Sequence, residues 1–462
     1  MSSGVDSSVA AALLIHSGHE NLQPFYMANW SPSANPPSVV PPQAPYNKPQ
    51  AKNSTVQTQP FQNQDSGKCT EREFNDVKDI CQAMGLKKPL YMSFEKEYWN
   101  EVFTPMIETF QRGRTPNPDI ECNRQIKFGV VVKRLEREFR REQDSRKFVD
   151  KKVRKWWMAT GHYARILHHI PTNNYHLFRS RDPNKDQTFF LSTIPPSIFP
   201  HLLFPLGFHG LTKPDVKTYA RALSLPGWRI GEPERQESMG LCFVEPGGGR
   251  GKSGFRRWLR EYLDPEPGDI IVGPSRTYGP NKQADRPHPA SQGKVIGQHQ
   301  GLWHATIGER SHLEFPQGDA RYVGKWYVSR KNKNENTLEV VRGLDNARLF
   351  GKGMVVEQWR WLGDDAEELA LGISRHSGSK TTENTIWENS LVAQFRHRQK
   401  PLRITKVEVL ENPTKPTENL PKRLKILFDT PERSVTPGQS AALWFGERCL
   451  GGGVIEDIID LD

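Results

Sequence analysis

Cysteine is scarce in this sequence and scattered along it. The five cysteines form no C-x-x-C pair and stand at positions 69, 81, 122, 242 and 449. An odd number of scattered cysteines argues against a secreted disulfide framework and for a reducing compartment. Because close cysteine pairs are missing, and His299 and His304 have no ligand partners at suitable spacing, we expect no zinc site, iron–sulfur cluster or other protein-held metal.

Long apolar runs and an excess of acidic residues are also missing. No apolar run approaches the roughly 18 residues that a membrane span needs, so we expect no membrane association. Lys and Arg number 64 against 53 Asp and Glu, which gives a formal net charge of +11. A basic surface suits a polyanionic partner but is also a common solubility feature, so charge alone leaves both readings open. With 462 residues, the chain can form two or three domains.

Several polar segments interrupt the apolar pattern. Residues 31–68 hold eight prolines and a single acidic residue, and they cannot bury enough apolar surface to offset the entropy of ordering. We therefore predict a disordered insertion there, and further polar loop extensions at 139–155, 246–252 and 274–292. The stretch PGGGRGKSGF at 246–255 nearly matches a phosphate-binding pattern, but Pro246 stands where the first Gly belongs, so we interpret it as an insertion.

The chain opens on MSSGVDSS, followed by the helix-favouring run VAAALLI. Small residues ahead of a helix let backbone N–H groups converge on an anion, which predicts a pyrophosphate-binding loop at Ser2–Ser8. A strand ordinarily precedes such a loop, and Met1 leaves no room for one. A serine-rich helix cap is the plainer alternative.

The stretch GRTPNPDIECNRQIKFG at 113–129 is the most specific in the chain. Its two prolines impose a rigid, extended loop, which presents Asp119 and Cys122 three residues apart. Arg124 and Lys127 could favour the thiolate, which is the nucleophilic form of cysteine. A structural cysteine is the alternative, although polar neighbours fit it less well.

Short β-type runs dominate the chain beyond about residue 323. KWYVS, TLEVV, LVAQFRHR, ITKVEVL, RLKILFD and SAALWF alternate with turn residues, which predicts an antiparallel barrel or sandwich. Residues 131–155 hold eleven Lys or Arg against five Asp or Glu. That segment is either a solvated helix face or a surface that contacts RNA.

Taken together, these stretches resemble a known family, the tRNA-specific 2-thiouridylases, in order and over nearly the whole chain. The motifs that carry the resemblance are SSGVDSSVAAALL, GRTPNPDIECNRQIKFG, ATGHYAR, NKDQTFFL, GLCFVEP, GQHQGLWHATIGER, KWYV, RHRQKP and VTPGQSAALWFGERCLGGGVIE. The resemblance implies a Rossmann-like α/β PP-loop domain of the adenine nucleotide alpha hydrolase type over residues 1–244. It further implies a small central domain over 245–322 and a C-terminal antiparallel β-barrel over 323–462.

The implied reaction is ATP-dependent sulfur transfer to carbon 2 of the wobble uridine of tRNA. By resemblance, Cys242 of GLCFVEP carries the persulfide, and Cys122 attacks it and forms a Cys122–Cys242 disulfide. Asp119 corresponds to the family's general acid/base, with Asn117 and Pro118 shaping the pocket for the base. A carbonyl oxygen is a poor leaving group, so adenylation by ATP explains why a pyrophosphate-binding loop and two reactive thiols share one chain.

The resemblance also assigns ligand-binding residues. The positions matching the ATP site are Ser2, Gly4, Val5, Asp6, Ser7, Met27 and Gly161, and Mg²⁺ is expected with the phosphates. The positions matching tRNA contacts are Asn117, Pro118, Asp119, His162, Lys185, Asp186, Gln187, Arg396, His397 and Gln439. Implied partners are tRNA and a persulfide carrier protein, and we expect a monomer. We expect a mitochondrial location because a bacterial-type family here carries insertions of a eukaryotic, fungal kind.

The sequence departs from the family at its start. The family has a strand before the loop and Gly where Ser3 stands, so we expect strain and weaker ATP binding at Ser3. We hypothesise that the natural protein starts upstream of Met1, with room for a mitochondrial presequence. Two alternatives stay open, namely another PP-loop ATP-dependent ligase or synthetase, and a truncated, non-catalytic tRNA-binding remnant.

Overall fold

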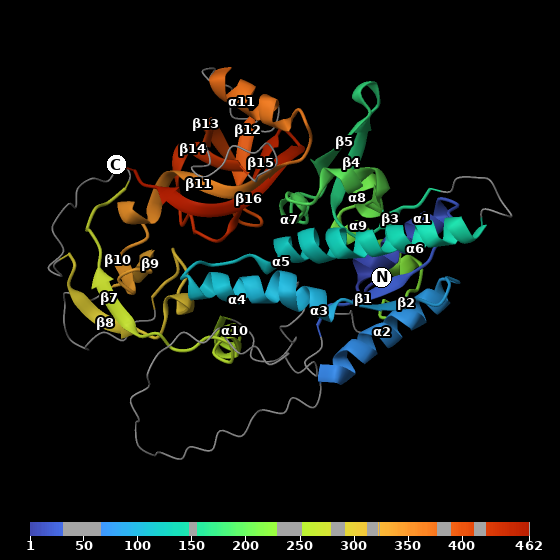
Figure 1. Cartoon of the computed structure of the whole chain (residues 1–462), viewed down its shortest axis with the longest axis horizontal. Helices are drawn as coiled ribbons and strands as arrows, with labels where there is room; N and C mark the ends of the chain where they lie inside the picture. Colours follow the sequence, from blue (N-terminus) through green and yellow to red (C-terminus); the bar gives the residue numbers. More distant parts are fainter. Residues whose placement is uncertain are drawn as a thin grey trace, which may run out of the picture.

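The computed structural model describes most of the chain. The described residues are 1–30, 66–146, 155–228, 252–278, 292–311, 322, 324–376, 390–410 and 422–461. Cys242 lies outside them, as do residues 31–65 of the expected insertion, 246–251 and 279–291. Figure 1 shows a helical N-terminal unit, a smaller sheet and a barrel, which confirms the expected fold class.

The N-terminal unit holds two parallel strand pairs with helices around them. Its first elements are α1 (Val5–His16), β1 (Phe25–Ala28), α2 (Ser66–Ala83), β2 (Leu90–Ser93), β3 (Met158–Ala159) and β6 (Leu202–Leu203). β1 pairs with β2 and β3 pairs with β6, both in parallel. No strand among the described residues joins the two pairs into one sheet. The helix after the opening loop is where the sequence predicts it, and Met27 lies on β1.

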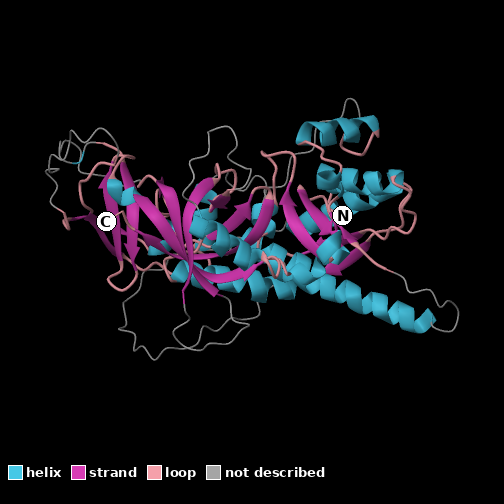
Figure 2. Cartoon of the chain, turned by 90° about the horizontal axis from the view of Figure 1, so that it is seen from above, coloured by secondary structure: helices cyan, strands magenta, loops and turns pink. Residues whose placement is uncertain are grey.

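A nearly continuous run of helices crosses the molecule beneath the barrel (Figure 1). It consists of α3 (Glu95–Tyr98), the π-helix η1 (Trp99–Phe103), α4 (Thr104–Gln111), α5 (Pro118–Glu121), the π-helix η2 (Cys122–Val130) and α6 (Val131–Arg146). The Arg112–Pro116 turn separates its two halves, since a helix cannot continue through the closely spaced prolines. Figure 2 shows α6 projecting beyond the body of the molecule. Ile120, Ile126 and Phe128 are almost fully buried and fix η2 against the core.

The rest of the N-terminal unit reaches toward the barrel. Its elements are β4 (Ala164–His169), β5 (Asn174–Arg179), α7 (Thr188–Leu191), α8 (Pro205–Phe208) and α9 (Lys213–Ala222). Among the described residues, 3-10 turns lie at Ile170–Thr172 and Pro196–His201 in this unit, and at Leu302–His304 and Ala347–Leu349 later in the chain. β4 and β5 form a hairpin, and β5 pairs with barrel strand β16 (Arg448–Ile459) through Phe178 and Arg448. The N-terminal unit and the barrel therefore share one hydrogen-bonded sheet.

The central unit is a four-stranded sheet with one helix. It comprises α10 (Lys252–Leu259), β7 (Gly268–Val272), β8 (Val295–His299), β9 (Trp326–Asn332) and β10 (Thr337–Arg342), in the order β8-β7-β10-β9. β9 and β10 were expected in the C-terminal barrel, but they belong to this sheet, so that expectation is wrong. β10 pairs in parallel with β7, so the expected boundary at residue 323 divides one sheet.

The C-terminal unit is a closed six-stranded barrel, as expected. It comprises β11 (Phe350–Trp361), α11 (Ala366–His376), β12 (Leu391–Gln394), β13 (Leu402–Leu410), β14 (Lys422–Arg433), β15 (Ser440–Phe445) and β16. The antiparallel pairing of β11 with β16 closes the ring. Alternating apolar side chains fill its interior, including Met354, Ile426 and Leu443, all fully buried. No helix in the described part of the chain is long and apolar enough to span a bilayer.

Candidate active site

The helix formed by α5 and η2 carries the two residues with the strongest chemical signal. Asn117 is the N-cap of α5 and Pro118 is its first residue, where a missing N–H costs nothing. Asp119 follows in the first turn, and Cys122 begins the π-helix η2. Residues three apart on a helix share a face, and π-helical turns occur often at functional sites. The expected extended loop is therefore wrong at Asp119 and Cys122, which lie three residues apart on a helix.

Cys122 faces the end of strand β1. Its side chain is half-buried. Asn29, which follows β1 directly and is 5% exposed, donates from Nδ2 to Cys122 Sγ at 3.8 Å. The thiol is therefore held beside the strand that leads from the PP-loop helix. Sequence reasoning missed Asn29 because the contact joins residues 93 positions apart.

The Asp119 carboxyl lies in a partly desolvated position. Burial raises the pKa of Asp119, and the nearby charge of Lys127 opposes this rise to a smaller extent. Asn123 positions Lys127, because Lys127 Nζ donates to Asn123 Oδ1 at 3.0 Å. Asn123 Nδ2 in turn donates to the carbonyl of Phe190 at 3.2 Å. A carboxyl whose pKa lies nearer to neutrality can exchange protons with a substrate base.

His162 lies in the loop after β3 and is 8% exposed. Its Nδ1 lies 2.7 Å from Thr160 Oγ1, and its ring centroid lies 5.5 Å from that of Phe128. Burial lowers the pKa of His162 well below 6.5, and Lys127 adds to this effect. The imidazole is consequently neutral at physiological pH and offers hydrogen bonds rather than charge.

The opening loop folds around the hydroxyl of Ser7. Ser2 N donates to Ser7 Oγ at 3.1 Å. The Ser7 hydroxyl can donate to the carbonyl oxygen of Ser2 at 2.8 Å or to that of Gly4 at 3.0 Å. Gly4 is the N-cap of α1, and no side chain caps this end of the helix. The first backbone N–H groups of α1 are therefore available to an anion. Ser3 is not among the described residues with positive φ, so the expected strain there is wrong.

Gly161 fits closely against this loop. A Cβ at position 161 would lie 2.7 Å from the carbonyl carbon of Asp6 and 2.8 Å from the nitrogen of Ser7, so only glycine allows the approach. The Asp6 carboxylate, however, is already paired. Lys213 Nζ donates to both of its oxygens at 2.8 Å, and the hydroxyl of Tyr163 donates to Oδ1 at 2.8 Å. Lys213 and Tyr163, which sequence reasoning missed, tie the loop to α9 and β4.

Gln439 connects the barrel to the proline-rich loop. Its Nε2 donates to the carbonyls of Thr115 and Pro116 at 3.0 and 3.1 Å. Thr115 N donates in turn to the carbonyl of Pro437 at 3.0 Å. The barrel residue predicted to contact tRNA therefore also positions the backbone that leads into Asn117 and Asp119.

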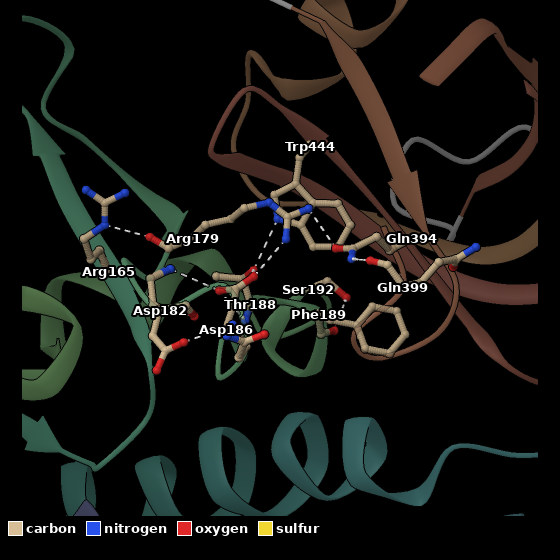
Figure 3. A network of polar contacts seen from close by, with 12 residues as sticks. Arg165, Arg179, Asp182, Asp186, Thr188, Phe189, Ser192, Gln394, Gln399 and Trp444 are labelled. Atoms are coloured by element: carbon tan, nitrogen blue, oxygen red, sulfur yellow. Dashed lines mark hydrogen bonds and ion pairs between the residues drawn. The ribbon is translucent and has the colours of Figure 1, made fainter. Parts of the chain in front are cut away.

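A second connection between the units centres on Arg179 and Asp186 (Figure 3). Arg179 Nη1 pairs with Asp186 Oδ2 at 2.8 Å, and Arg179 Nη2 donates to Gln394 Oε1 at 2.8 Å. The Arg179 guanidinium lies 4.0 Å from the ring centroid of Trp444, on β15. Asp186 also accepts from the hydroxyl of Thr188 at 2.8 Å. Its buried carboxylate fits a role in joining the units better than the expected contact with tRNA.

The remaining predicted tRNA residues gather near this network. Gln187 exchanges hydrogen bonds with the backbone of Tyr163, at 2.9 Å each way. The His397 ring centroid lies 4.7 Å from that of Phe190, and burial lowers the pKa of His397. Arg396 Nη2 donates to the carbonyl of Arg433 at 3.0 Å. Lys185 is half-buried, on the same turn as Asp186. In the described residues, no three His, Cys, Asp or Glu side chains converge as a metal site would require.

The fold and these contacts define a PP-loop protein. Its N-terminal domain is of a nucleotide-binding type and is followed by the central sheet unit and the C-terminal barrel. Family models match all three units, namely the "tRNA methyl transferase HUP domain" at residues 49–246, the "tRNA methyl transferase PRC-barrel domain" at 256–342, and the "Aminomethyltransferase beta-barrel domain" at 351–455. The use of ATP is implied by this type of N-terminal domain.

The chain belongs to the tRNA-specific 2-thiouridylase family. It is similar to the mitochondrial tRNA-specific 2-thiouridylase 1 of Schizosaccharomyces pombe, with 34% identity over 99% of this chain and 89% of the relative. The protein of the same name from Saccharomyces cerevisiae is 33% identical over 100% of this chain and 92% of its own length. A tRNA-specific 2-thiouridylase of Geobacillus kaustophilus is 31% identical over 100% of this chain and 95% of its own length. The resemblance read from the motifs is thus confirmed.

Proposed function

We propose that this protein is an ATP-dependent tRNA sulfurtransferase that converts the wobble uridine to 2-thiouridine. The observation that carries the proposal is the placement of Asp119 and Cys122 on one helix of the N-terminal unit, next to the barrel. Asn29 contacts the thiol from the PP-loop side, and Gln439 holds the preceding loop from the barrel side. Full-length similarity to proteins named as tRNA-specific 2-thiouridylases supports the same assignment.

The chemistry proceeds in two balanced stages. First, the carbon-2 oxygen of uridine attacks the α-phosphate of ATP, so that an O–P bond forms, pyrophosphate leaves and the oxygen becomes part of an AMP leaving group. Secondly, the Cys122 thiolate attacks the inner sulfur of a persulfide on Cys242 and forms a disulfide. The released hydrosulfide attacks carbon 2 and displaces AMP, and an external dithiol or thiol reductant then restores both cysteines.

The described residues have distinct parts in this scheme. Asp119 exchanges a proton at the base, which suits its raised pKa. The first amides of α1, with Ser2, Gly4, Val5 and Ser7, hold the pyrophosphate end of ATP, and Gly161 lets the next loop approach it. Mg²⁺ bound together with ATP would supply positive charge to the phosphates. Asp6, paired with Lys213, orients the helix, and Met27 lies on the adjoining strand.

The proposal extends to partners and location. Asn117 and Pro118 shape the pocket for the base, and His162, Lys185, Arg396 and His397 contact the tRNA around it. A persulfide carrier protein charges Cys242, the enzyme acts as a monomer, and it works in mitochondria, as the names of its fungal relatives say of those proteins.

Nucleoside mass spectrometry tests the function. The purified protein is incubated with unmodified tRNA, a persulfide donor and ATP, and the tRNA is then digested and analysed. We expect 2-thiouridine at the wobble position only when ATP is present. ATP turnover without sulfur in the tRNA would instead indicate a PP-loop ligase or synthetase, and RNA binding without ATP turnover would indicate a non-catalytic remnant.

A further inference from the structure

Asn29 places its side-chain amide against the sulfur of Cys122. Asn29 Nδ2 donates to Cys122 Sγ at 3.8 Å. Because Asn29 is only 5% exposed, water competes little for this contact. Asn29 stands directly after β1, at the carboxyl end of a parallel strand, where the ligand sites of open α/β sheets lie. The contact therefore connects the helix that carries the nucleophile to the sheet at the level of the active site.

Both partners of this contact belong to rigid parts of the fold. Ala28, the residue before Asn29, is 1% exposed and ends the strand pair of β1 and β2. Trp30, the residue after it, stacks on Trp99 with the ring centroids 5.6 Å apart. The helix around Cys122 is fixed by its almost fully buried apolar side chains. Donor and acceptor are thus held in place by packing on either side.

The two cations nearest to Cys122 in the sequence have other partners. Arg124 Nη2 pairs with the carboxylate of Glu121 at 2.5 Å. Lys127 Nζ donates to a side-chain amide oxygen at 3.0 Å. The sequence suggested that these two side chains favour the thiolate, whereas a contact that the structure does show at the sulfur comes from the neutral amide of Asn29.

We propose that Asn29 is a positioning residue that favours the thiolate of Cys122 and orients it for attack on the persulfide. This proposal rests on the proposed function, because that function makes Cys122 the nucleophile. A hydrogen bond to the charged form of a group stabilises that form over the neutral one. A thiolate accepts an N–H more strongly than a thiol does, so the contact strengthens when Cys122 loses its proton.

The step that this contact assists is the attack on the persulfide. The thiol of Cys122 first gives its proton to solvent. Its electron pair then forms a bond to the inner sulfur of Cys242, the bond between the inner and outer sulfur atoms breaks, and the electron pair of that bond leaves on hydrosulfide. The hydrogen bond raises the share of thiolate near neutral pH, and it makes the thiolate slightly less nucleophilic.

These two effects oppose each other and predict a crossover with pH. Below the titration midpoint of Cys122, the share of thiolate determines the rate, so loss of the Asn29 amide slows the reaction. Above the midpoint all of the protein carries the thiolate, so a sulfur without the hydrogen bond reacts faster. A substitution that merely loosens the fold gives no reason for such a reversal.

Alkylation of Cys122 by iodoacetamide tests the crossover without tRNA or ATP. Mass spectrometry of the Cys122 peptide follows the rate in reduced wild-type protein, Asn29→Ala and Asn29→Asp, over a pH range that spans the ordinary thiol value of about 8.5. We expect Asn29→Ala to raise the midpoint by about one pH unit, to slow alkylation about threefold below it and to accelerate it about threefold above it. Asn29→Asp should raise the midpoint further, because its carboxylate repels the thiolate.

Asn346→Ala is the matched control. Asn346 is also 5% exposed, and it caps a 3-10 turn in another part of the chain. Its side chain accepts from the backbone N–H of Arg348 at 2.9 Å and donates to the carbonyl of Pro274 at 3.0 Å. The control variant therefore loses buried hydrogen bonds that do not involve Cys122, and it should keep the wild-type pH profile of alkylation.

The other outcomes contradict specific parts of the proposal. An unchanged midpoint in both Asn29 variants, or a rate lowered by the same factor at every pH, would overturn the role of Asn29, while the proposed function would stand. If the midpoint shifts but wild-type protein forms no 2-thiouridine from a persulfide donor, the proposed function fails, and with it the part of Asn29 in persulfide attack. Thermal unfolding of each variant verifies that the fold is retained.

Discussion

Burial changes the acid–base behaviour of several side chains, among them the carboxyl of Asp119 and the amine of Lys331. Asp119 lies where the chemistry needs a proton donor or acceptor, and its pKa is raised by burial. Lys331, on β9, has a buried Nζ with no hydrogen-bond partner among the described residues. Burial lowers its pKa to about 7. Asp119 should therefore affect how the reaction rate depends on pH, and Lys331 should affect how the stability of the fold depends on pH.

Asp119→Asn should slow thiolation by roughly a hundredfold or more, because general acid–base catalysis contributes at least about that much. The KM for ATP should change little, since Asp119 is not in the opening loop. The wild-type rate against pH should show an acidic limb displaced above 3.8, the ordinary value from which the pKa of Asp119 is raised. The variant should lack this limb. An unchanged rate and pH profile in Asp119→Asn would contradict the assigned role.

Lys331→Met should stabilise the protein near neutral pH. A lysine whose folded-state pKa is lowered contributes stability above its unfolded value of 10.5, and that contribution is lost as pH falls toward 7. Removing the amine should therefore raise the free energy of unfolding by about 1–3 kcal/mol at pH 7 and by less at pH 10. Urea unfolding measures this, with Lys333→Met, at a more exposed lysine, as the control. Lower stability of Lys331→Met at pH 7 would refute the explanation.

At the scale of elements, the approach of the 161 loop to α1 determines the shape of the nucleotide site. A methyl group on residue 161 would press on the backbone of Asp6 and Ser7. Gly161→Ala should weaken ATP binding about tenfold or more, and it should destabilise the fold by roughly 1–3 kcal/mol because the backbone must shift. Calorimetric titration and denaturant unfolding measure the two effects.

Gly372→Ala is the matched control for that substitution. Gly372 lies within α11, and a Cβ there would meet no atom within 4 Å. Since alanine favours a helix over glycine by up to about 1 kcal/mol, this variant should keep its ATP affinity and gain slight stability. If both glycine variants behave alike, close packing at Gly161 is not the reason for its identity.

The sequence predicted those elements whose signals are local. The helix after the opening loop depends on neighbouring residues and is found where expected, whereas Asp119 and Cys122 lie on a helix and not on the expected extended loop. The assignment of β9 and β10 failed because β10 pairs with β7, far earlier in the chain, through Leu338 and Ile270, and alternation alone does not name a strand's partner. Asn29 and Lys213 escaped notice for the same reason, since their contacts are made only by folding.

At the scale of the whole molecule, the pair of Arg179 and Asp186 joins the N-terminal unit to the barrel (Figure 3). Both side chains are at least nine-tenths buried, and Asp186 partly offsets the burial that lowers the pKa of Arg179. The family resemblance of the motif NKDQ implied a tRNA contact for Asp186. Only the fold shows that Asp186 faces an arginine seven residues earlier in the chain.

Breaking this pair should destabilise the protein strongly. Arg179→Met and Asp186→Asn should each lower the free energy of unfolding by about 3–5 kcal/mol, because each leaves a buried partner uncompensated. The double variant should lose much less than the sum, which a double-mutant cycle by denaturant unfolding measures. Arg165→Met, at the more exposed pair with Glu447, serves as the control and should cost about 1 kcal/mol or less. Additive losses would show that the two side chains do not act together.

The proposed mechanism requires the thiols of Cys122 and Cys242 to meet during the reaction. Peptide mapping after a single turnover tests this requirement directly. Protein carrying a persulfide on Cys242 is mixed with ATP and tRNA without reductant, then quenched and digested. We expect a disulfide between Cys122 and Cys242 to accumulate in step with 2-thiouridine. Cys122→Ser should form neither, and Cys449→Ala, at a buried barrel thiol, should form both. Thiouridine formation with Cys122 replaced, or with both thiols still reduced, would contradict the account.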